Sequence, residues 1–336
     1  MRILAYLTAL LVPLGAYAQD RAPILMDVTE THILPRFAQL ANATETLATT
    51  AQTDCDPASD DLRAAYGAAF DSWILASHLR FGPTETNDRA FSMAFWPDTK
   101  GFTPKALSRH IESEDAAVDT PEAYAETSIA GRGFMALERM LYDQALAEQG
   151  RAAYRCALIR AIAIDIDQNA KAMNTDWQTY APNLTQSGGD SPYRTGDEAM
   201  QELFRALTTG LEFTADTRLG RPMGTFERPR PNRAEARRSA RSLRHVELSL
   251  IALRDLAARL SFDHPEIAAD LDAAFAQAIE RAQSLDDPAF AGVGTPQGRI
   301  RVEALQQSVN DIREFASTEL GPTLGISAGF NSLDGD

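Results

Sequence analysis

Apolar residues recur at helical spacing along almost the whole chain, and this limits the fold more than any other feature. Between residues 59 and 83, for example, Leu62, Tyr66, Phe70 and Trp73 fall on one stripe of a helix. Strands of a half-buried sheet would instead alternate polar and apolar residues, and no segment keeps such an alternation over a strand's length. We therefore predict an all-α fold with little or no β structure.

The same periodicity divides the chain into two groups of helices. The stretch 181–196, APNLTQSGGDSPYRTG, is rich in Pro, Gly and Ser and interrupts the pattern. We expect it to separate two helical bundles, residues 19–190 and 191–336, because four antiparallel helices are the smallest arrangement that closes an apolar seam. The predicted helices are 27–51, 60–81, 104–114, 121–131, 134–145, 151–180, 197–217, 233–260, 265–284 and 299–319.

The first residues have the features of a secretory signal. A single Arg2 precedes an apolar stretch from Ile3 to Leu14, and the small residues Ala16 and Ala18 follow. This order predicts a signal peptide over residues 1–18 that is cleaved after Ala18. No later run is long and apolar enough to predict a transmembrane segment. We expect a periplasmic protein.

The charge of the chain restricts its partners. The formal net charge is −15, and removal of residues 1–18 would make it −16 because that segment holds one basic residue and no acid. Nucleic acids and anionic lipid surfaces are themselves negative and are disfavoured as partners. Cationic ligands, including metal ions, remain compatible with this charge, which can also simply favour solubility.

The two cysteines predict a disulfide bond. Neither Cys55 nor Cys156 has a second cysteine or a histidine at the spacing of a metal site, and an oxidising compartment favours pairing. Such a bond would close a loop of roughly 100 residues and stabilise the fold by about 4 kcal/mol in the chain-entropy description. Two free thiols are the alternative.

Sequence signatures of common enzyme classes are missing. The five histidines include no HExxH pattern, and the chain has neither a G-x-S-x-G elbow nor a phosphate-binding G-x-x-x-x-G-K loop. One carboxylate nevertheless attracts attention, because Glu138 lies in an apolar helical run, GRGFMALERMLYD. If Glu138 is buried it must be hydrogen-bonded, paired, metal-bound or protonated. It could equally pair with Arg80, Arg132 or Arg139, or lie at a solvated edge.

Several motifs together are similar to those of the imelysin-like family of bacterial cell-envelope proteins. They are THILPRFAQLA near the mature start, RFGP at 80–83, FWPD at 95–98, GFMALE at 133–138, RLGRPMG at 218–224 and the tail GISAGFNSLDGD. The resemblance covers nearly all of the mature chain. It implies an all-helical protein of two bundle-like domains, with a functional site near a G-x-H-x-x-E motif at their junction.

The resemblance also implies a set of site residues. Gly133 and Glu138 occupy the glycine and glutamate places of the motif, and Met135 stands where the histidine would be. A thioether is a poor ligand for hard or borderline cations and cannot act as a general base. Glu138 and His32, from another helix, are the candidate metal ligands. Trp73, Arg80 and Asp98 are expected to line a ligand pocket that faces Glu138, with Arg80 as its ion-pair partner.

Three functions follow from the resemblance. The family was named for a proposed metallopeptidase activity, while related members belong to iron-uptake systems. The missing histidine favours a non-catalytic binding role in envelope iron or metal acquisition, with an iron ion or an iron-bearing ligand in the interdomain groove and envelope transport proteins as partners. The alternatives are a metallopeptidase that uses Glu138 and a periplasmic adaptor that binds an envelope protein.

Overall fold

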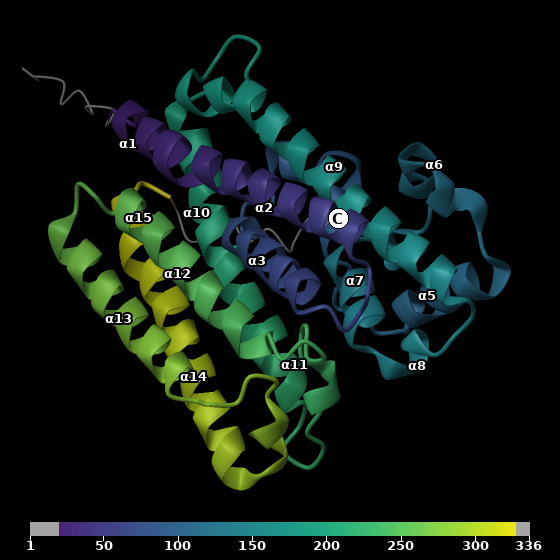
Figure 1. Ribbon diagram of the computed structural model, residues 1–336. Coiled ribbons are helices and arrows are strands. Elements are labelled where there is room, and N and C mark those ends of the chain that lie inside the picture. Colours follow the sequence, from purple (N-terminus) through teal and green to yellow (C-terminus); the bar gives the residue numbers. More distant parts are fainter. Residues whose placement is uncertain (1–19, 327–336) are drawn as a thin grey trace, which may run out of the picture.

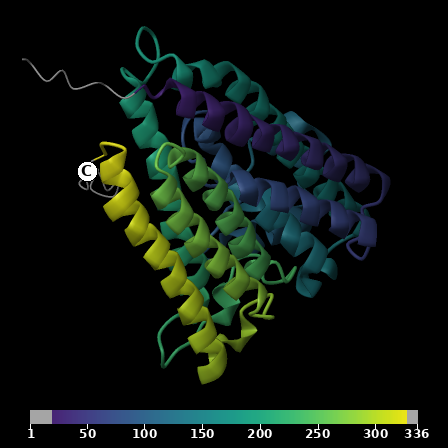
Figure 2. The same ribbon diagram turned by 90° about the vertical axis from the view of Figure 1, so that its left-hand side faces the viewer.

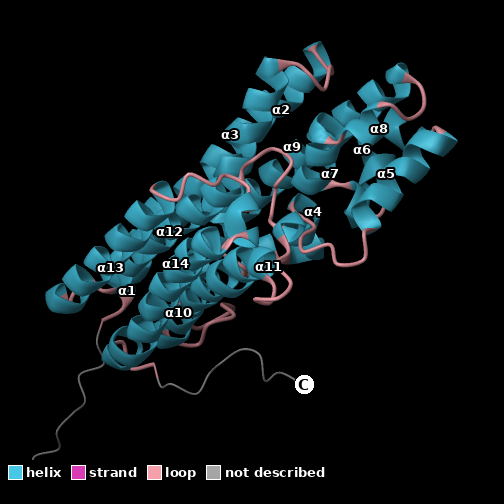
Figure 3. Cartoon of the chain, turned by 90° about the horizontal axis from the view of Figure 1, so that it is seen from below, coloured by secondary structure: helices cyan, strands magenta, loops and turns pink. Residues whose placement is uncertain are grey.

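The described part of the protein is built from helices. The computed structural model describes residues 20–326, and within this range the only β pairing is an isolated bridge between Thr225 and Arg228 (Figure 3). The predicted all-α class is confirmed. Within the same range, no helix combines the length and apolar character needed to cross a membrane. The predicted signal peptide and the last ten residues, which include the end of the tail motif, lie outside the described residues.

The N-terminal half is organised around three long helices, with α2 packed against both α3 and α9 (Figure 1). Shorter helices cover one end of this group, and α7 packs on α9. The elements are α1 (Ala22–Asp27), the π-helical η1 (Val28–Ile33), α2 (Leu34–Thr53), α3 (Asp60–Ala76), α4 (Arg89–Met93), α5 (Phe102–Ser113), α6 (Pro121–Ala125), α7 (Gly133–Tyr142), α8 (Gln144–Ala147) and α9 (Ala152–Thr185).

The C-terminal half is a second bundle, in which α10, α12, α13 and α14 pack against their neighbours (Figure 2). Its elements are α10 (Gly196–Glu212), the π-helical η6 (Phe213–Leu219), α11 (Gly220–Met223), α12 (Ser242–Leu260), α13 (Pro265–Gln283), α14 (Pro296–Phe315), the π-helical η9 (Ala316–Leu320) and α15 (Gly321–Thr323). The connection from α9 to α10 falls within the predicted interruption at 181–196. The predicted domain limits, 19–190 and 191–336, remain a prediction.

The two halves share one apolar core. Helix α3 packs against α12, and the buried apolar residues of both halves belong to a single cluster. The ends of the described chain also meet, because the Arg21 guanidinium donates to the Leu324 carbonyl at 2.6 Å and pairs with Asp197 at 2.8 Å. Any site between α3 and α12 is therefore enclosed by elements from both halves.

Local signals in the sequence explain several helix starts. The hydroxyl of Ser59 accepts from the Leu62 N–H, and that of Thr120 accepts from the Ala123 N–H, as N-caps do. Pro35 falls in the first turn of α2, directly after η1. The wider π turn fits the missing N–H and the bulk of the proline ring without ending the helical path.

The largest error among the predicted helix boundaries lies at the start of α12, and the helices predicted at 60–81 and 121–131 end earlier, at Ala76 and Ala125. The expected helix 233–260 begins only at Ser242, because residues 234–241 form turns in which Ala236 and Ala240 have positive φ. The pattern Asn232 to Glu235 resembles a capping box, but the Glu235 carboxylate is buried and accepts from Arg218 instead.

The predicted disulfide is confirmed. Cys55 and Cys156 are bonded, with Cα atoms 5.2 Å apart, and no free cysteine occurs in the described residues. Cys55 follows α2 and Cys156 lies in the first turns of α9, so the bond ties together two helices that already pack side by side.

Candidate functional site

Five of the seven predicted site residues line two cavities, which share the side chain of Trp96. Trp73 and Arg80 line the larger one, which lies between α3, α10 and α12 and which we call the junction cavity. Asp98, Met135 and Glu138 line the smaller one, which we call the motif cavity. The structure therefore brings Asp98, Met135 and Glu138 together and places Trp73 and Arg80 in the adjacent cavity. Gly133 and His32 line neither cavity.

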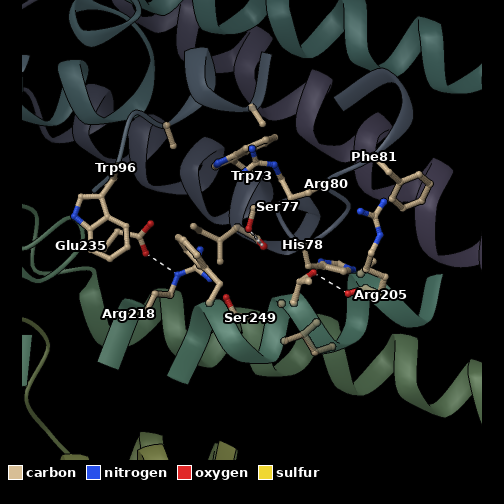
Figure 4. Close-up of a pocket in the computed structure, with 18 of the residues that line it drawn as sticks. Trp73, Ser77, His78, Arg80, Phe81, Trp96, Arg205, Arg218, Glu235 and Ser249 are labelled. Atoms are coloured by element: carbon tan, nitrogen blue, oxygen red, sulfur yellow. Dashed lines mark hydrogen bonds and ion pairs between the residues drawn. The ribbon is translucent and has the colours of Figure 1, made fainter. Parts of the chain in front are cut away.

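The junction cavity encloses about 290 Å³ between the two halves of the protein. Figure 4 shows Trp73 and Ser77 on the side of the N-terminal half, facing Arg218 and Ser249 on the side of the C-terminal half. Its walls are mainly apolar and aromatic, with a few charged side chains. The lining includes Trp73, Phe81, Trp96, Phe213, Leu253, Arg80, Arg205, Arg218, Glu202, Glu235, His78 and Ser249.

Each arginine of the junction cavity is paired with an acid. Arg80 binds Glu85 and Arg205 binds Glu202, both at partly exposed positions. Arg218 is different, because it and its partner Glu235 are both buried and their Nε–Oε2 distance is 2.7 Å. The predicted ion pair between Arg80 and Glu138 is therefore wrong, since Arg80 is held by an acid five residues along its own segment.

A second group joins the buried pair from α12. Nδ1 of His245 lies 3.0 Å from the Oε2 atom of Glu235 that Arg218 also contacts. Burial alone would raise the pKa of Glu235, but Arg218 and His245 outweigh it and lower the pKa to about 2. Glu235 is thus an ionised acceptor at neutral pH, fixed by two donors.

His32 belongs to a different polar chain. Its Nδ1 lies 2.7 Å from Oδ2 of Asp255, and its Nε2 lies 2.9 Å from Nε2 of His78. Both ring nitrogens of His32 are therefore engaged, and the structure does not bring this side chain to Glu138. His78, which does line the junction cavity, separates His32 from it.

Glu138 is buried at the contact between the two halves, with only 1% of its surface exposed. The backbone N–H and the hydroxyl of Ser239 both donate to its Oε1, each at 2.9 Å. The arginines proposed from sequence as partners bind other acids, Arg132 binding Asp165 and Arg139 binding Asp143. Glu138 on α7 is thus joined to the turns that precede α12 by neutral donors.

The motif cavity is small and rich in arginine. It encloses about 100 Å³, and Arg139, Arg221, Arg233 and Arg238 line it together with Asp98 and Glu138. Asp98 accepts the backbone N–H groups of Phe102 and Thr103, so its carboxylate orders the start of α5. These groups leave little room for a ligand and more positive than negative charge around it.

Gly133, the motif glycine, has a steric role. Its φ is +70°, and a Cβ atom at this position would collide with the carbonyl oxygens of Ser92 and Met93. Only glycine lets the first turn of α7 lie against the end of α4. The close packing of these two helices places Met135 and Glu138 beside Trp96.

The donor set of the described residues does not form a metal site. Within residues 20–326, no group of three or more His, Cys, Asp or Glu side chains could hold a metal ion. The motif cavity offers the carboxylates of Glu138 and Asp98 and the thioether of Met135, but Asp98 already accepts two backbone N–H groups and a thioether is a poor ligand for zinc. The residues present therefore do not fit the metal that the motif would suggest.

Sequence reasoning missed His78, Arg218, Glu235 and Ser249. His78 follows α3, and the other three lie in the segment from η6 to α12. Arg218 opens the RLGRPMG motif at 218–224, but nothing in that motif connects it to the other three residues. Arg218 lies in η6, and π-helical turns often occur at functional sites, but such a turn cannot be read from the sequence pattern.

The fold and the cavities define an all-helical, two-bundle protein with a ligand-sized space at the junction. The family profile described as Imelysin matches residues 33–314, and the chain belongs to the imelysin family. It is 25% identical over 279 residues to Iron-regulated protein A of Synechococcus elongatus. The aligned residues cover 77% of this chain and 73% of that relative.

Two solved structures have a similar fold. An imelysin-like protein from Psychrobacter arcticum 273-4 superposes with a TM-score of 0.77 at 21% identity, over 92% of this chain and 97% of that one. A putative iron-regulated protein A precursor from Parabacteroides distasonis gives a TM-score of 0.62 at 13% identity, over 88% of this chain and 94% of that one. At these identities the likeness shows the fold alone.

Proposed function

We propose that this protein is a non-catalytic binding protein of the bacterial cell envelope, and that its junction cavity holds a small ligand of iron uptake. The observation that carries the proposal is the cavity itself. It is enclosed by both halves, has aromatic walls and contains a few directed polar groups. Small-molecule sites in proteins combine these three properties.

The lining indicates the chemistry of the ligand. Trp73, Phe81 and Trp96 offer flat apolar surfaces, and Arg205 and Arg218 offer N–H donors toward the same space. Arginine binds carboxylates well, and aromatic walls favour ligands with a planar apolar face. We infer a small organic anion, such as an iron chelator or its iron complex, rather than a bare ion.

The link to iron and to the envelope rests on the family and on the sequence. A relative is named for its regulation by iron. The predicted signal peptide over residues 1–18 supports export to the periplasm, where envelope transport proteins would exchange the ligand with this protein. A bare metal ion is disfavoured because the motif cavity lacks a sufficient donor set.

Isothermal titration with a matched pair of variants tests the proposal. Thr209 lines the junction cavity, whereas its neighbour Thr208 does not, and both hydroxyls donate to the Arg205 carbonyl. The ligands are ferric citrate, 2,3-dihydroxybenzoate with and without Fe(III), haem, and Fe(II) alone. We expect an organic ligand to bind, Thr209→Trp to weaken it by at least about tenfold, and Thr208→Trp to change it less than about twofold.

Two outcomes would overturn the proposal. One is binding of bare Fe(II) alone, with no organic ligand taken up. The other is binding that Thr209→Trp leaves unchanged, which would place the ligand outside the junction cavity.

The peptidase alternative makes a separate prediction. A metallopeptidase that uses Glu138 would show metal-dependent proteolysis that Glu138→Gln abolishes. The binding role predicts no metal-dependent cleavage of a peptide library by either form, because the described residues hold no three-ligand set.

A further inference from the structure

A hydrogen-bonded series of three polar side chains, of which His32 and His78 are buried and Asp255 is partly exposed, ends at the wall of the junction cavity. Asp255 on α12 contacts Nδ1 of His32 at 2.7 Å, and Nε2 of His32 contacts Nε2 of His78 at 2.9 Å. His78 lines the cavity, and no hydrogen bond to its Nδ1 occurs within residues 20–326. The hydrogen bonds therefore run from Asp255 through His32 to His78, and His78 borders the cavity.

The carboxylate of Asp255, at the end away from the cavity, determines which ring nitrogen of each histidine carries its proton. An ionised carboxylate only accepts hydrogen bonds, so Nδ1 of His32 must carry the proton that faces Asp255. Nε2 of a neutral His32 is then an acceptor, and Nε2 of His78 must donate to it. Arg36 does not decide the assignment, because its Nε lies 3.4 Å from Nε2 of His32 and its Nη2 lies 3.3 Å from Nδ1 of the same ring. The carboxylate of Asp255, which is the nearest group to Nδ1, determines it.

The surroundings keep both rings neutral. Burial lowers the pKa of His32 to about 4, although the hydrogen bond to Asp255 acts in the opposite direction. Burial, His32 and Arg36 lower the pKa of His78 well below its usual range. A neutral His78 that donates from Nε2 carries a lone pair on Nδ1.

Charged side chains from several helices influence the pKa values of His32 and His78. Arg36 from α2, Asp255 and Arg259 from α12, and Arg218 from η6 all act on His32 or His78. Three of these four groups are cations, and they oppose the addition of a proton to either ring.

A second unused polar atom lines the same cavity. The hydroxyl of Ser249 is buried and has no hydrogen-bond partner within the described residues. Ser249 and Leu253 are one turn apart on α12, and both line the cavity with His78. Buried hydroxyls in native proteins nearly always have a partner, so this one is available to a water molecule or to a ligand group that enters the cavity.

We propose that His78 and Ser249 form a subsite that recognises an O–H or N–H group of the ligand, with Nδ1 of His78 as a fixed hydrogen-bond acceptor. This inference rests on the proposed binding function and narrows its ligand to an anion that also carries a hydrogen-bond donor. Aromatic hydroxy acids have this chemistry and also match the tryptophan walls. His32 and Asp255 act as positioning residues, since they hold His78 in the required tautomer.

The tautomer can be measured without any ligand. Nitrogen-15 NMR of histidine-labelled protein at pH 7 distinguishes protonated from unprotonated ring nitrogens, and His78→Phe identifies the signal. We expect His78 to carry its proton on Nε2 and to have an unprotonated Nδ1. A proton on Nδ1, or a doubly protonated ring, would overturn the proposal.

A pair of probes tests the recognition step. 2,3-Dihydroxybenzoate and 2,3-difluorobenzoate share an aromatic face and a carboxylate and are similar in size, but only the first has O–H donors. We expect the wild-type protein to prefer the hydroxylated probe by at least about tenfold and His78→Phe to reduce this preference to about twofold. His110→Phe is the control, since His110 is as buried as His78, 7% exposed, and lines neither cavity.

The positioning role of Asp255 has its own signature. In Asp255→Asn the side-chain amide can donate to Nδ1 of His32. The hydrogen bond between His32 and His78 would then reverse its direction, and His78 would carry its proton on Nδ1. We expect the NMR signature of His78 to change and the preference for the hydroxylated probe to disappear. An unchanged signature would show that Asp255 does not set the tautomer.

The outcomes separate the two proposals. Equal binding of both probes, weakened by Thr209→Trp, would leave the cavity as the binding site and overturn the role of His78. Binding of neither probe would overturn the ligand class. Binding with an affinity that Thr209→Trp leaves unchanged would overturn the proposed function itself.

Discussion

The junction cavity and the motif cavity share Trp96, but the carboxylate of Glu138 in the motif cavity and the polar groups of Ser249 and His78 in the junction cavity differ in their hydrogen bonding. At the motif cavity, Oε1 of Glu138 already receives two hydrogen bonds from Ser239, and Gly133 is required for packing. At the junction cavity, the hydroxyl of Ser249 is buried without a partner in the described part of the chain, and the hydrogen bond of His78 there is made by Nε2 and not by Nδ1. Glu138 thus has its donors without a ligand, whereas Ser249 and Nδ1 of His78 have unused hydrogen-bonding capacity. The motif cavity also holds an unpartnered donor, Nε of Arg221, but this atom is not part of the predicted motif.

This difference shows that a motif can keep its place in a fold while the groups that meet a ligand lie elsewhere. The resemblance places Met135 where the motif has a histidine, and in the structure the other two motif residues, Gly133 and Glu138, join α7 to α4 and to the turns before α12. We infer that Glu138 mainly stabilises the contact between the halves. Four variants or conditions can break or sharpen this comparison.

The largest effect is expected at the buried pair beside the junction cavity. Arg218→Met would leave Glu235 buried without its cation, and we expect a loss of about 3–5 kcal/mol of unfolding free energy in urea at pH 7. Arg139→Met on the motif side should cost only about 1 kcal/mol, because its partner Asp143 also binds Arg238. Equal losses would contradict the comparison. Adding Glu235→Gln to Arg218→Met should recover part of the loss.

A backbone change at the motif should come next. Gly133→Ala combines an unfavourable positive φ with a collision against the Ser92 and Met93 carbonyls, and we expect it to cost about 2–4 kcal/mol. Urea unfolding provides the measurement. Gly189→Ala is the matched control, since Gly189 also has positive φ but has no atom within 4 Å of the position that a Cβ would take. A loss at Gly133 no larger than the control's would remove its steric role.

Acid should weaken the junction side. His32 has a pKa near 6.5 when unfolded and about 4 when folded, so the unfolded chain binds more protons between these values and stability falls as pH decreases. Between pH 7 and pH 5 we expect His32 alone to account for a loss of about 2 kcal/mol. Glu235 adds little in this window, since its pKa is lowered from 4.5 to about 2 and most of its contribution is lost only in stronger acid. Urea titrations at pH 7, 6 and 5 measure the slope, which His32→Asn should reduce; an unchanged slope would contradict the assignment.

The smallest effect is expected at Glu138. Glu138→Gln keeps an oxygen that can accept from Ser239, so we expect a cost of about 1 kcal/mol or less and no more than about a twofold change in affinity for a junction-cavity ligand. Calorimetry and urea unfolding measure the two quantities. A loss of affinity of more than about tenfold would mean that the ligand extends into the motif cavity.

Much of the fold could be predicted because its signals are local. The helical stripe around Trp73, the caps at Ser59 and Thr120 and the pairing of the two cysteines depend on short segments or on residue counts. The helix start at Ser242 could not be predicted. Glu235 has a side chain that can cap a helix, but in the structure it is buried in an ion pair with Arg218.

The site was predicted less well because it depends on long-range contacts. His32 and His78 are 46 residues apart, and His32 and Asp255 are 223 apart. Ser239 lies 101 residues from Glu138, the residue that it binds. The burial of Glu138 followed from its apolar neighbours, but nothing in those neighbours indicated which donors would satisfy it.

The contact of Arg21 with the Leu324 carbonyl has a practical consequence for the topology of the chain. Since both ends of the described range meet there, a short flexible linker from residue 326 back to residue 20 should join them, and new termini could open between Gly189 and Asp190, which are exposed. Such a circular permutant would begin with the second bundle and end with the first. Its ability to fold would show whether the order of the bundles along the chain matters, or only their final contact.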